Sequence, residues 1–526
     1  MGRFGLPAPV PELARRRWDV VVVGAGHNGL TAAAYLARSG ASVLVLEQRA
    51  QVGGACTLEQ PFADERWLVS PCAYLVGLLH PLVVEELDLR ARGYEVEVVD
   101  PHLWCPFDDG SAVTLWNDPE RSAAAIAEWA QRDVDGYLAY EALFGRIRRL
   151  LRDGSRDVWV GDAPDRSELD ELLGDDSEAR ETLFEASIAD VVERHVRDER
   201  LRTALHGQGV IGTYAGPREP GTAAVHAMHA SGTLDGEAGA WGYVRGGMGV
   251  VAFALADAAV EAGATIATGV SVGAIVPGEG VRLDGGELIR AQVVVSNADP
   301  KRTLSLCEDG VPESFRARVA AWRSESPVLK LNCGLARLPT FAAARAGDRP
   351  HRAMVTISGG IDATQAACEA SRRGVPSPAW CELYFHTAYD ESVAPPGRHA
   401  MSVFAQYVPY RLSAGDWDQR RDEIADLALE RIAAFAPDVM DVIEERQVLG
   451  PPDVEARIGL TGGHIFQGEC LPDQMWTNRF TPRTPVRGLY LCGAATHPGG
   501  SVIAVNGRNA AIAVLADLPD AATSPT

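Results

Sequence analysis

Three glycines near the N-terminus have the spacing of a nucleotide-binding turn. Gly24, Gly26 and Gly29 lie between an apolar run, Val20–Val23, and a segment with helical spacing that starts at Asn28. The first glycine permits a tight turn, the second lets the backbone approach a pyrophosphate, and the third lets helix and strand pack closely. The phosphates would lie at the helix N-terminus, where free N–H groups and the helix dipole favour negative charge. The spacing therefore predicts dinucleotide binding.

An acidic residue follows at the place where such a site needs one. Glu47 ends a second apolar run, Ser42–Leu46, roughly 20 residues beyond the third glycine, where a carboxylate can accept hydrogen bonds from ribose hydroxyls. The pair Gly53–Gly54 comes soon after, and it fits an extended FAD that passes close to the backbone, although an ordinary turn would look the same. The cofactor contacts expected in this region of the chain are Gly24, Gly26, Asn28, Gly29, Glu47, Gln48, Arg49, Gly53, Gly54, Ala55 and Cys56.

A second glycine-rich segment lies at the other end of the chain. Residues 489–511 read LYLCGAATHPGGSVIAVNGRNAA, a predicted strand that opens through Gly493 and Gly499–Gly500 into a helix expected over Ser501–Leu515. The N–H groups at such a helix start can stabilise negative charge on a reduced flavin. Two nucleotide-contacting elements so far apart favour FAD over NAD. The further cofactor contacts expected are Val270, Gly493, Gly500, Ser501 and Val502.

The elements that must position these residues are scattered along the chain. A helical pattern begins at Asp118–Pro119, a cap-like Asp with Pro at the first helical position. Strand signals return after Gly242 and again between residues 325 and 410. We therefore expect an α/β fold (α+β overall), with a Rossmann-type FAD-binding domain built from discontinuous segments, an interleaved substrate domain and a helical insertion. The expected order is a tail (1–16), a first FAD-binding segment (17–115), a helical or substrate region (116–240), a second FAD-binding segment (241–300), a substrate domain (301–484), a third FAD-binding segment (485–518) and a disordered tail (519–526).

Several blocks of the chain resemble one family of flavoproteins. They are VVVGAGHNGLTAAAYLARSGASVLVLEQRAQVGGAC, YVRGGMGVVAFALADAAVEAGATI, AQVVVSNADP, GLTGGHIFQGECLPDQMW and LYLCGAATHPGGSVIAVNGRNAA. Together they resemble the FAD-dependent carotenoid desaturase and ketolase-like (phytoene desaturase-like) proteins, in particular the pyridine nucleotide-disulphide oxidoreductase domain branch, within the flavin amine oxidase fold group. The resemblance implies desaturation or oxidation of an apolar, polyene- or lipid-like molecule by hydride transfer to flavin N5, with oxygen or a quinone as electron acceptor. Disulphide chemistry is disfavoured because Cys56 has no cysteine partner nearby.

Two residues are candidates for catalysis. Lys330 lies in SPVLKLNCGL and resembles the lysine that holds a water at flavin N5 in flavin amine oxidases, but Val328, Lys330 and Asn332 share one strand face, so it could equally be a solvent-facing residue. His497 precedes Pro498 and the second glycine pair, where it could assist proton transfer or simply hold the loop. If Lys330 lies at N5, we expect Lys330→Met to retain FAD and to slow reoxidation by oxygen.

Two other functions stay open from the residues alone. An amine or amino-acid oxidase is supported by Lys330 and weakened by Ser501, because amine oxidases of this fold often place an aromatic residue there. An aliphatic tunnel would favour the desaturase, whereas an aromatic pair with a carboxylate at the pocket mouth would favour an amine substrate. A flavin-containing regulatory protein, whose FAD serves structure, is the third possibility.

Composition excludes several classes of partner. The 526 residues carry 49 basic and 71 acidic side chains, a net charge of −22, which repels phosphate backbones and anionic headgroups. We therefore expect a small-molecule substrate, no nucleic acid and at most peripheral membrane contact, with the oligomeric state open. Nine scattered cysteines without metal-ligand spacing fit a reducing compartment and no metal, and we expect a cytoplasmic protein.

Overall fold

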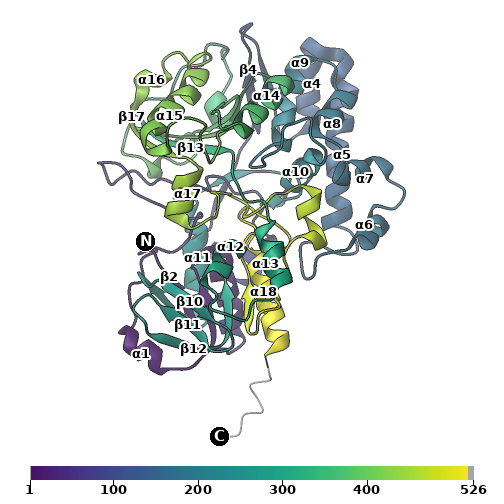
Figure 1. Cartoon of the computed structure of the whole chain (residues 1–526). Coiled ribbons are helices and arrows are strands. Elements are labelled where there is room, and N and C mark those ends of the chain that lie inside the picture. The colour runs from purple at the N-terminus through teal and green to yellow at the C-terminus, as the bar shows by residue number, and fades with distance from the viewer. Residues whose placement is uncertain (1, 519–526) are drawn as a thin grey trace.

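The computed structural model describes residues 2–518, which form two lobes (Figure 1). The lower lobe in Figure 1 holds one seven-stranded sheet with the first and last described residues beside it, and the upper lobe holds a second seven-stranded sheet flanked by helices. The predicted disordered tail, 519–526, lies outside the described residues.

The first sheet has the order β10-β11-β12-β1-β2-β9, with β18 paired to β12. Strands β18, β12, β1, β2 and β9 run parallel, and β10 to β12 form an antiparallel meander. The strands are β1 (Trp18–Val23), β2 (Val43–Glu47), β9 (Thr265–Thr268), β10 (Val272–Val276), β11 (Gly280–Leu283), β12 (Leu288–Ser296) and β18 (Leu489–Leu491). The helices of this lobe include α2 (His27–Arg38), α11 (Gly249–Glu261), α12 (Pro300–Leu306), α13 (Glu313–Ala320) and α18 (Val505–Asp517).

Both faces of the first sheet are apolar. Along β1, Val20 and Val22 pack with α2, α11 and α18, whereas Val21 and Val23 pack into a different cluster with residues of the meander. Successive strand side chains point to opposite faces, so a strand covered on both sides must be a continuous apolar run. This is why the run Val20–Val23 identified the strand from sequence.

The second sheet has the order β17-β13-β16-β15-β14-β4-β5. Its members are β4 (Leu103–Pro106), β5 (Ala112–Leu115), β13 (Val328–Leu335), β14 (Met354–Ser358), β15 (Trp380–Tyr384), β16 (His399–Gln406) and β17 (Ile443–Leu449). Because β4 pairs in parallel with β14, the end of the first expected FAD-binding segment (17–115) belongs to the upper lobe. The adjoining helices are α14 (Ile361–Arg372), α15 (Trp417–Ala433), α16 (Val439–Val442) and α17 (Pro451–Ile458).

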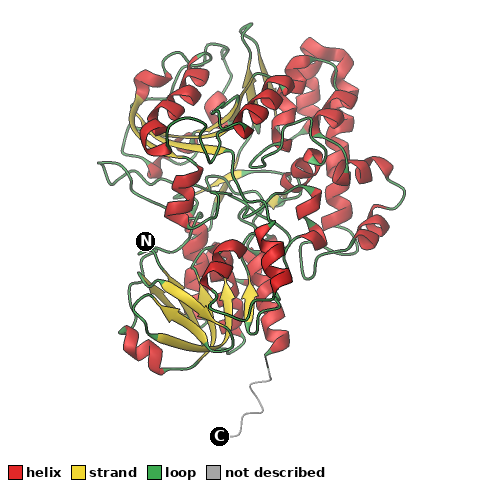
Figure 2. Ribbon diagram, in the orientation of Figure 1, coloured by secondary structure: helices red, strands yellow, loops and turns green. Residues whose placement is uncertain are grey.

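The helical insertion lies on the right in Figures 1 and 2. It consists of α4 (Pro119–Ala130), α5 (Val134–Arg152), α6 (Arg166–Leu173), α7 (Ser177–Phe184), α8 (Ile188–His195), α9 (Glu199–Leu205) and α10 (Thr222–His229). Asp118 caps α4 as predicted, by accepting a hydrogen bond from the Glu120 N–H at 3.0 Å. Short elements join these regions: α3 (Pro81–Glu86), β3 (Val96–Val98), β6 (Thr233–Leu234), β7 (Glu237–Ala238) and β8 (Gly242–Val244).

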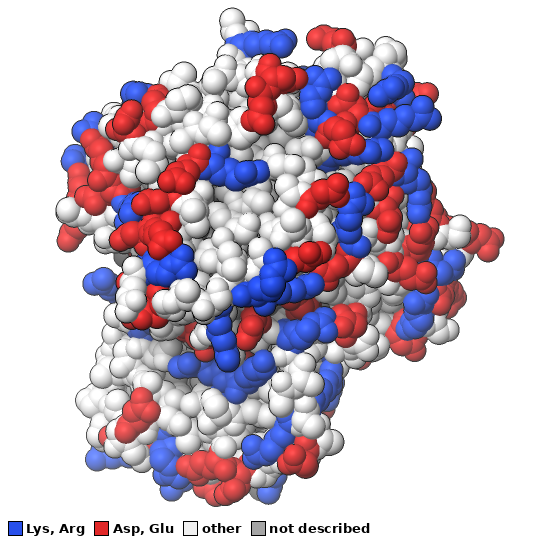
Figure 3. All heavy atoms as spheres, turned by 45° about the horizontal axis from the view of Figure 1, so that its top comes forward, with Lys and Arg blue, Asp and Glu red and all other residues white. Residues whose placement is uncertain are grey.

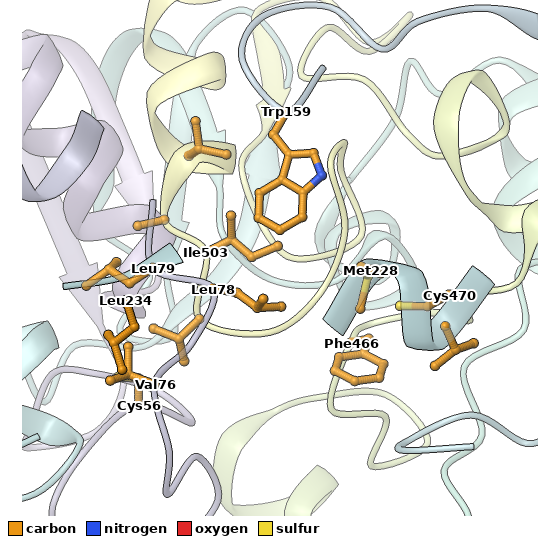
Figure 4. Packing of buried hydrophobic residues seen from close by; sticks show 14 of the residues in the cluster. Cys56, Val76, Leu78, Leu79, Trp159, Met228, Leu234, Phe466, Cys470 and Ile503 are labelled. Atoms are coloured by element: carbon orange, nitrogen blue, oxygen red, sulfur yellow. The ribbon is translucent and has the colours of Figure 1, made fainter. Parts of the chain in front are cut away.

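A buried apolar cluster joins the helical insertion to the lower lobe. Figure 4 shows Trp159 and Ile503 close to Leu78, with Met228 and Phe466 nearby. These residues come from segments far apart in the chain, so burying them holds the segments together.

Residues 2–16, which were predicted to be part of an N-terminal tail, instead pack on the lower lobe. Val10–Arg15 form α1, and the Gly5 N–H donates to Thr268 Oγ1 at 2.8 Å while the Thr268 N–H donates to the Gly5 carbonyl at 2.9 Å. The Val52 N–H also donates to the Gly2 carbonyl at 2.9 Å. Among residues 2–518, no helix is both long and apolar enough to cross a membrane.

Acidic and basic side chains are interspersed on the face seen in Figure 3. Many form ion pairs, as Arg446 does with Asp422 and Asp426 at 2.8 and 2.6 Å. Exposed pairs of this kind contribute about 0–1 kcal/mol each to stability. The surface charge therefore says little about what holds the fold together.

Candidate active site

One large cavity runs from the glycine turn of the first sheet to the face of the second. The space between its lining atoms is about 1810 Å³ when the part that opens to solvent is included. One end is lined by the turn at Gly24 and Gly26 and by Glu47, and the other by Tyr74, Tyr384 and further side chains of the upper lobe. A cavity that joins the two lobes can hold a dinucleotide and a substrate together.

The glycine turn is held in a fixed shape by its own backbone. The Gly24 N–H donates to the Leu46 carbonyl at 2.8 Å, and the Gly53 N–H donates to the Ala25 carbonyl at 2.8 Å. A Cβ at Gly29 would lie 2.3 Å from the Gly24 carbonyl oxygen, so the third glycine lets α2 pack against the turn. Gly24 has a φ of +93°, which favours glycine.

Glu47 lies at the C-terminal end of β2 and is 6% exposed. Its two carboxylate oxygens accept hydrogen bonds from the Ala25 N–H at 2.8 Å and the Arg49 N–H at 2.9 Å. Burial raises the pKa of this carboxyl, and the backbone N–H donors oppose that shift. A carboxylate has about four acceptor positions, so Glu47, which lines the cavity, can accept a further hydrogen bond from a ribose hydroxyl.

The residues around the turn fit a bound dinucleotide. Asn28 Oδ1 and His27 Nε2 are buried polar atoms without a hydrogen-bond partner, and both residues line the cavity. Helix α2 begins at His27 with no side-chain cap, so its first N–H groups are free to bind phosphate oxygens. A Cβ at Gly26 would lie 2.5 Å from Asn297 Nδ2, so the narrow passage there depends on a bare backbone.

The C-terminal segment differs from the expected helix start. Ser501 and Ala504 have φ values of +86° and +66°, so residues 501–504 form a loop and α18 starts only at Val505. Ser501 and Val502 line the cavity, but the helix N-terminus is displaced from the predicted position. The strand predicted from Leu489 is present as β18 (Leu489–Leu491), and a loop follows it as predicted.

A buried arginine holds this loop in place. The Arg479 guanidinium is fully buried and donates to the carbonyls of Ala494 at 2.7 Å, Phe466 at 2.8 Å and Glu469 at 2.8 Å. Burial lowers its pKa, and the surrounding carbonyl dipoles compensate the cation. Arg479 therefore holds the loop at Ala494 against the segment that carries Phe466 and Glu469.

Most of the predicted cofactor residues lie along the cavity wall. Gly29, Cys56, Gly493 and Gly500 do not, and they serve packing instead: the Cys56 thiol contacts the Met248 carbonyl at 3.2 Å, and a Cβ at Gly500 would lie 2.2 Å from Phe466. The predicted residues that line the cavity are Gly24, Gly26, Asn28, Glu47, Gln48, Arg49, Gly53, Gly54, Ala55, Val270, Ser501 and Val502.

Lys330 is neither a surface residue nor a cavity-lining one. It is 3% exposed, and its Nζ donates to Asn332 Oδ1 at 2.8 Å and to Ser402 Oγ. The ammonium also lies 4.5 Å from the ring centroid of Tyr74, which does line the cavity. Burial lowers the Lys330 pKa to about 7. The solvent-facing alternative is therefore wrong, and a direct role at flavin N5 stays a prediction because Tyr74 is the residue that faces the cavity.

His497 lies outside the cavity wall. It is 3% exposed, and its Nε2–H donates to the Val158 carbonyl at 2.6 Å, which links the C-terminal loop to the helical insertion. Burial lowers its pKa to about 4, so the ring is neutral at ordinary pH. This geometry favours the structural alternative for His497 over proton transfer.

The substrate end of the cavity was not predicted from sequence. Its aromatic side chains include Tyr74 and Tyr384, whose ring centroids lie 4.4 Å apart, and Phe404, 6.1 Å from Tyr74. Glu382 lies in the same wall, and a single acidic residue in the apolar strand WCELY is the signal that could have found it. The other lining residues of this end include Leu75, Gln208, Ile211, His229, Trp241, Met354, Ile465 and Phe466.

Comparison with known proteins identifies the family. Residues 108–515 match the model of flavin containing amine oxidoreductases, and residues 22–78 match the NAD(P)-binding Rossmann-like domain. The chain belongs to the flavin containing amine oxidoreductase family. It is an FAD-dependent oxidoreductase, and the predicted cofactor and fold class are confirmed. Within residues 2–518, no cluster of His, Cys, Asp or Glu could hold a metal ion.

Individual members of this family resemble the chain over nearly its whole length. Pyridine nucleotide-disulfide oxidoreductase domain-containing protein 2 of Mus musculus is 34% identical, covering 95% of this chain and 94% of its own. Hydroxyneurosporene desaturase of Cereibacter sphaeroides is 28% identical, covering 95% and 98%. A putrescine oxidase variant of known structure has a TM-score of 0.60 at 14% identity, covering 95% and 99%, a likeness of fold alone. The resemblance to phytoene desaturase-like flavoproteins is therefore confirmed.

Proposed function

We propose that this flavoprotein dehydrogenates a largely apolar small molecule of isoprenoid or lipid-like character. The observation that supports this most directly is the continuous cavity, in which the substrate end is walled by apolar and aromatic side chains such as Leu75, Ile211, Met354 and Phe404. FAD, when bound, would supply the two-electron acceptor for a hydride from one carbon, and a proton would leave the adjacent carbon to water. The desaturase relative supports the same class of reaction.

The residues of the chain would then act by binding, orientation and exclusion of water. Gly24 to Asn28 and Glu47 would hold the pyrophosphate and ribose, and the loop at Ser501 and Val502 would lie along the opposite end of the cofactor. The apolar wall would exclude water from the reacting carbon, as dehydrogenation of an unactivated C–H bond requires. Oxygen or a quinone would reoxidise the flavin.

Anaerobic mixing tests this proposal. The purified flavoprotein would be mixed without oxygen with an isoprenoid polyene, a fatty acyl compound and a set of primary amines, while the visible flavin absorbance is followed. We expect the isoprenoid or acyl compound to bleach the flavin. Bleaching by the amines alone would reject the proposal.

An amine oxidase is the second candidate, because one specific observation favours it. The two tilted rings of Tyr74 and Tyr384, next to the Glu382 carboxyl, could surround a substrate ammonium. Glu382 is only 1% exposed, however, so it lies within the wall and not at a solvent-exposed mouth. The same anaerobic experiment separates the two candidates.

A further inference from the structure

The cavity face of the second sheet carries a row of unlike residues at matched positions. Strand pairing places Phe404 on β16 opposite Glu382 on β15 and opposite Lys330 on β13, so the three side chains share one face. Thr356 on β14 continues the row beside Glu382. Two ionisable side chains therefore flank an aromatic ring in the interior of the molecule, and one of them, Glu382, lines the cavity.

The Glu382 carboxyl has only neutral partners. It accepts hydrogen bonds from the Tyr384 hydroxyl, from Gln208 Nε2 at 3.0 Å and, at the limit of hydrogen bonding, from Thr356 Oγ1 at 3.5 Å. Desolvation of a buried carboxylate is costly unless charge-assisted partners compensate it. These three donors organise the group without neutralising it, which leaves it able to accept from a fourth donor in the cavity.

We propose that Glu382 anchors the substrate by accepting a hydrogen bond from a donor group on it, a hydroxyl or an ammonium. This deepens the proposed function, on which it rests, because it gives the apolar substrate one hydrogen-bond donor group, which we call its polar handle. Tyr74 and Tyr384 would flank the handle, and the apolar wall would receive the rest of the molecule.

The groups around Glu382 are compatible with this role. Burial raises the Glu382 pKa to about 7, so the carboxylate is accessible near neutral pH. On the neighbouring elements, Tyr74 and Tyr384 are held as neutral phenols because burial raises the pKa of each, and the Lys330 ammonium lies beyond Tyr74 with its pKa lowered to about 7. His229, also in the cavity wall, is kept neutral because burial lowers its pKa, and its Nδ1 has no partner.

Three probes on one carbon skeleton test the proposal in the FAD-loaded protein. They are 2,6-dimethylocta-2,6-diene, geraniol, which adds a hydroxyl, and geranylamine, which adds an ammonium. Dissociation constants would be measured from the change in the flavin spectrum on binding, without turnover. We expect the alcohol or the amine to bind the wild-type protein about tenfold or more tightly than the hydrocarbon, as one hydrogen bond to a charged group allows.

Two substitutions at the same position identify the handle. Glu382→Leu should abolish the preference and leave the hydrocarbon affinity within about a factor of two, because it removes the acceptor but keeps an apolar wall. Glu382→Gln keeps an acceptor oxygen and the shape but loses the charge. It should keep the alcohol preference if the handle is a hydroxyl, and lose the amine preference if it is an ammonium.

The control is Glu237→Leu, an exposed carboxylate on β7, which should change none of the three affinities. The proposal is overturned if the wild-type protein shows no preference for either donor probe, or if Glu382→Leu weakens all three probes equally or changes none. Flavin content and hydrocarbon binding reveal a folding defect. If the probes bind in the expected order but none bleaches the flavin, the isoprenoid dehydrogenase proposal fails while the anchoring role stands.

Discussion

The two seven-stranded sheets differ in the side chains that their faces carry. In the first sheet both faces are apolar, so Val20 and Val21 on β1 enter separate hydrophobic clusters. In the second sheet Leu329 and Leu331 face an apolar cluster shared with α15, whereas Lys330 points to the other face, with Glu382 on a neighbouring strand. The first sheet thus has its candidate binding residues at the strand ends, whereas the second sheet has its ionisable residues on one face.

This difference separates cofactor binding from substrate recognition. A parallel sheet covered on both faces presents free groups only where its strands end, which is where Gly24 and Glu47 lie. The second sheet is mostly antiparallel, and its other face combines a small apolar cluster with the polar side chains of Lys330 and Glu382 and forms a cavity wall. Changes at the strand ends should therefore alter FAD retention, and changes on the face should alter ligand affinity.

The largest effect is expected at the turn of the first sheet. Gly26→Val should yield protein without FAD, because even a Cβ there would lie 2.5 Å from Asn297 Nδ2 and a branched side chain would fill the pyrophosphate passage. The measurement is the ratio of flavin to protein after purification. Gly145→Val on α5 is a matched control, since its Cβ meets only the flexible Arg149 side chain at 3.4 Å, and it should keep full flavin content.

A smaller effect is expected at the end of β2. Glu47→Ala should weaken FAD binding by about 10- to 100-fold, because it removes charge-assisted hydrogen bonds worth about 1.5–3 kcal/mol each. Titration of the apoprotein with FAD measures it. Glu47→Gln preserves the side-chain shape and should lose less. An unchanged dissociation constant in the alanine variant would contradict the assignment of Glu47 to the ribose.

The face of the second sheet should respond to pH. Burial raises the Glu382 pKa to about 7, so geranylamine affinity should rise as pH increases through that value, while the carboxyl ionises and the amine stays protonated. We expect about a tenfold gain between roughly pH 6 and pH 8. Dissociation constants measured across that range should vary in the wild-type protein and stay flat in Glu382→Gln. A flat wild-type profile would count against an ionisable anchor at this position.

The smallest effect is expected at Lys330. Burial lowers its pKa from 10.5 to about 7, so the unfolded chain binds more protons between those values and stability should rise with pH there. Lys330→Met should make the rise in Tm across this pH window smaller by about 2 °C or more. The same variant tests the predicted role in reoxidation: stopped-flow rates with oxygen within a factor of about two of wild type would end that hypothesis.

Sequence reasoning found the cofactor end because its signals are local. Gly24, Gly29 and Glu47 lie within one βαβ unit, and each type of residue is required by a nearby backbone conformation or by the nucleotide. The same reasoning placed the last helix too early, at Ser501, because apolar spacing does not reveal the positive φ angles at Ser501 and Ala504 that delay the start of α18 to Val505.

The substrate end could not be assembled in this way. Tyr74, Glu382 and Phe404 come together only through the pairing of β15 with β16 and the docking of a distant loop, and neither leaves a local spacing pattern. What the sequence does show is a polar residue inside an apolar strand, as at Lys330 and Glu382. Both residues lie on the cavity face of the second sheet, and the solvent-facing alternative for Lys330 overlooked how apolar its strand is.

The cofactor cavity is completed by a strand and loop close to the C-terminus. Strand β18 pairs with β12, and the loop that follows it is clamped by Arg479. Because domains fold from the N-terminus while the ribosome still adds residues, the first βαβ unit must wait until β18 and its loop have been made before its nucleotide site can close. Flavin capture would then require that synthesis has passed β18, and chains that stop before it would remain colourless and open to proteolysis.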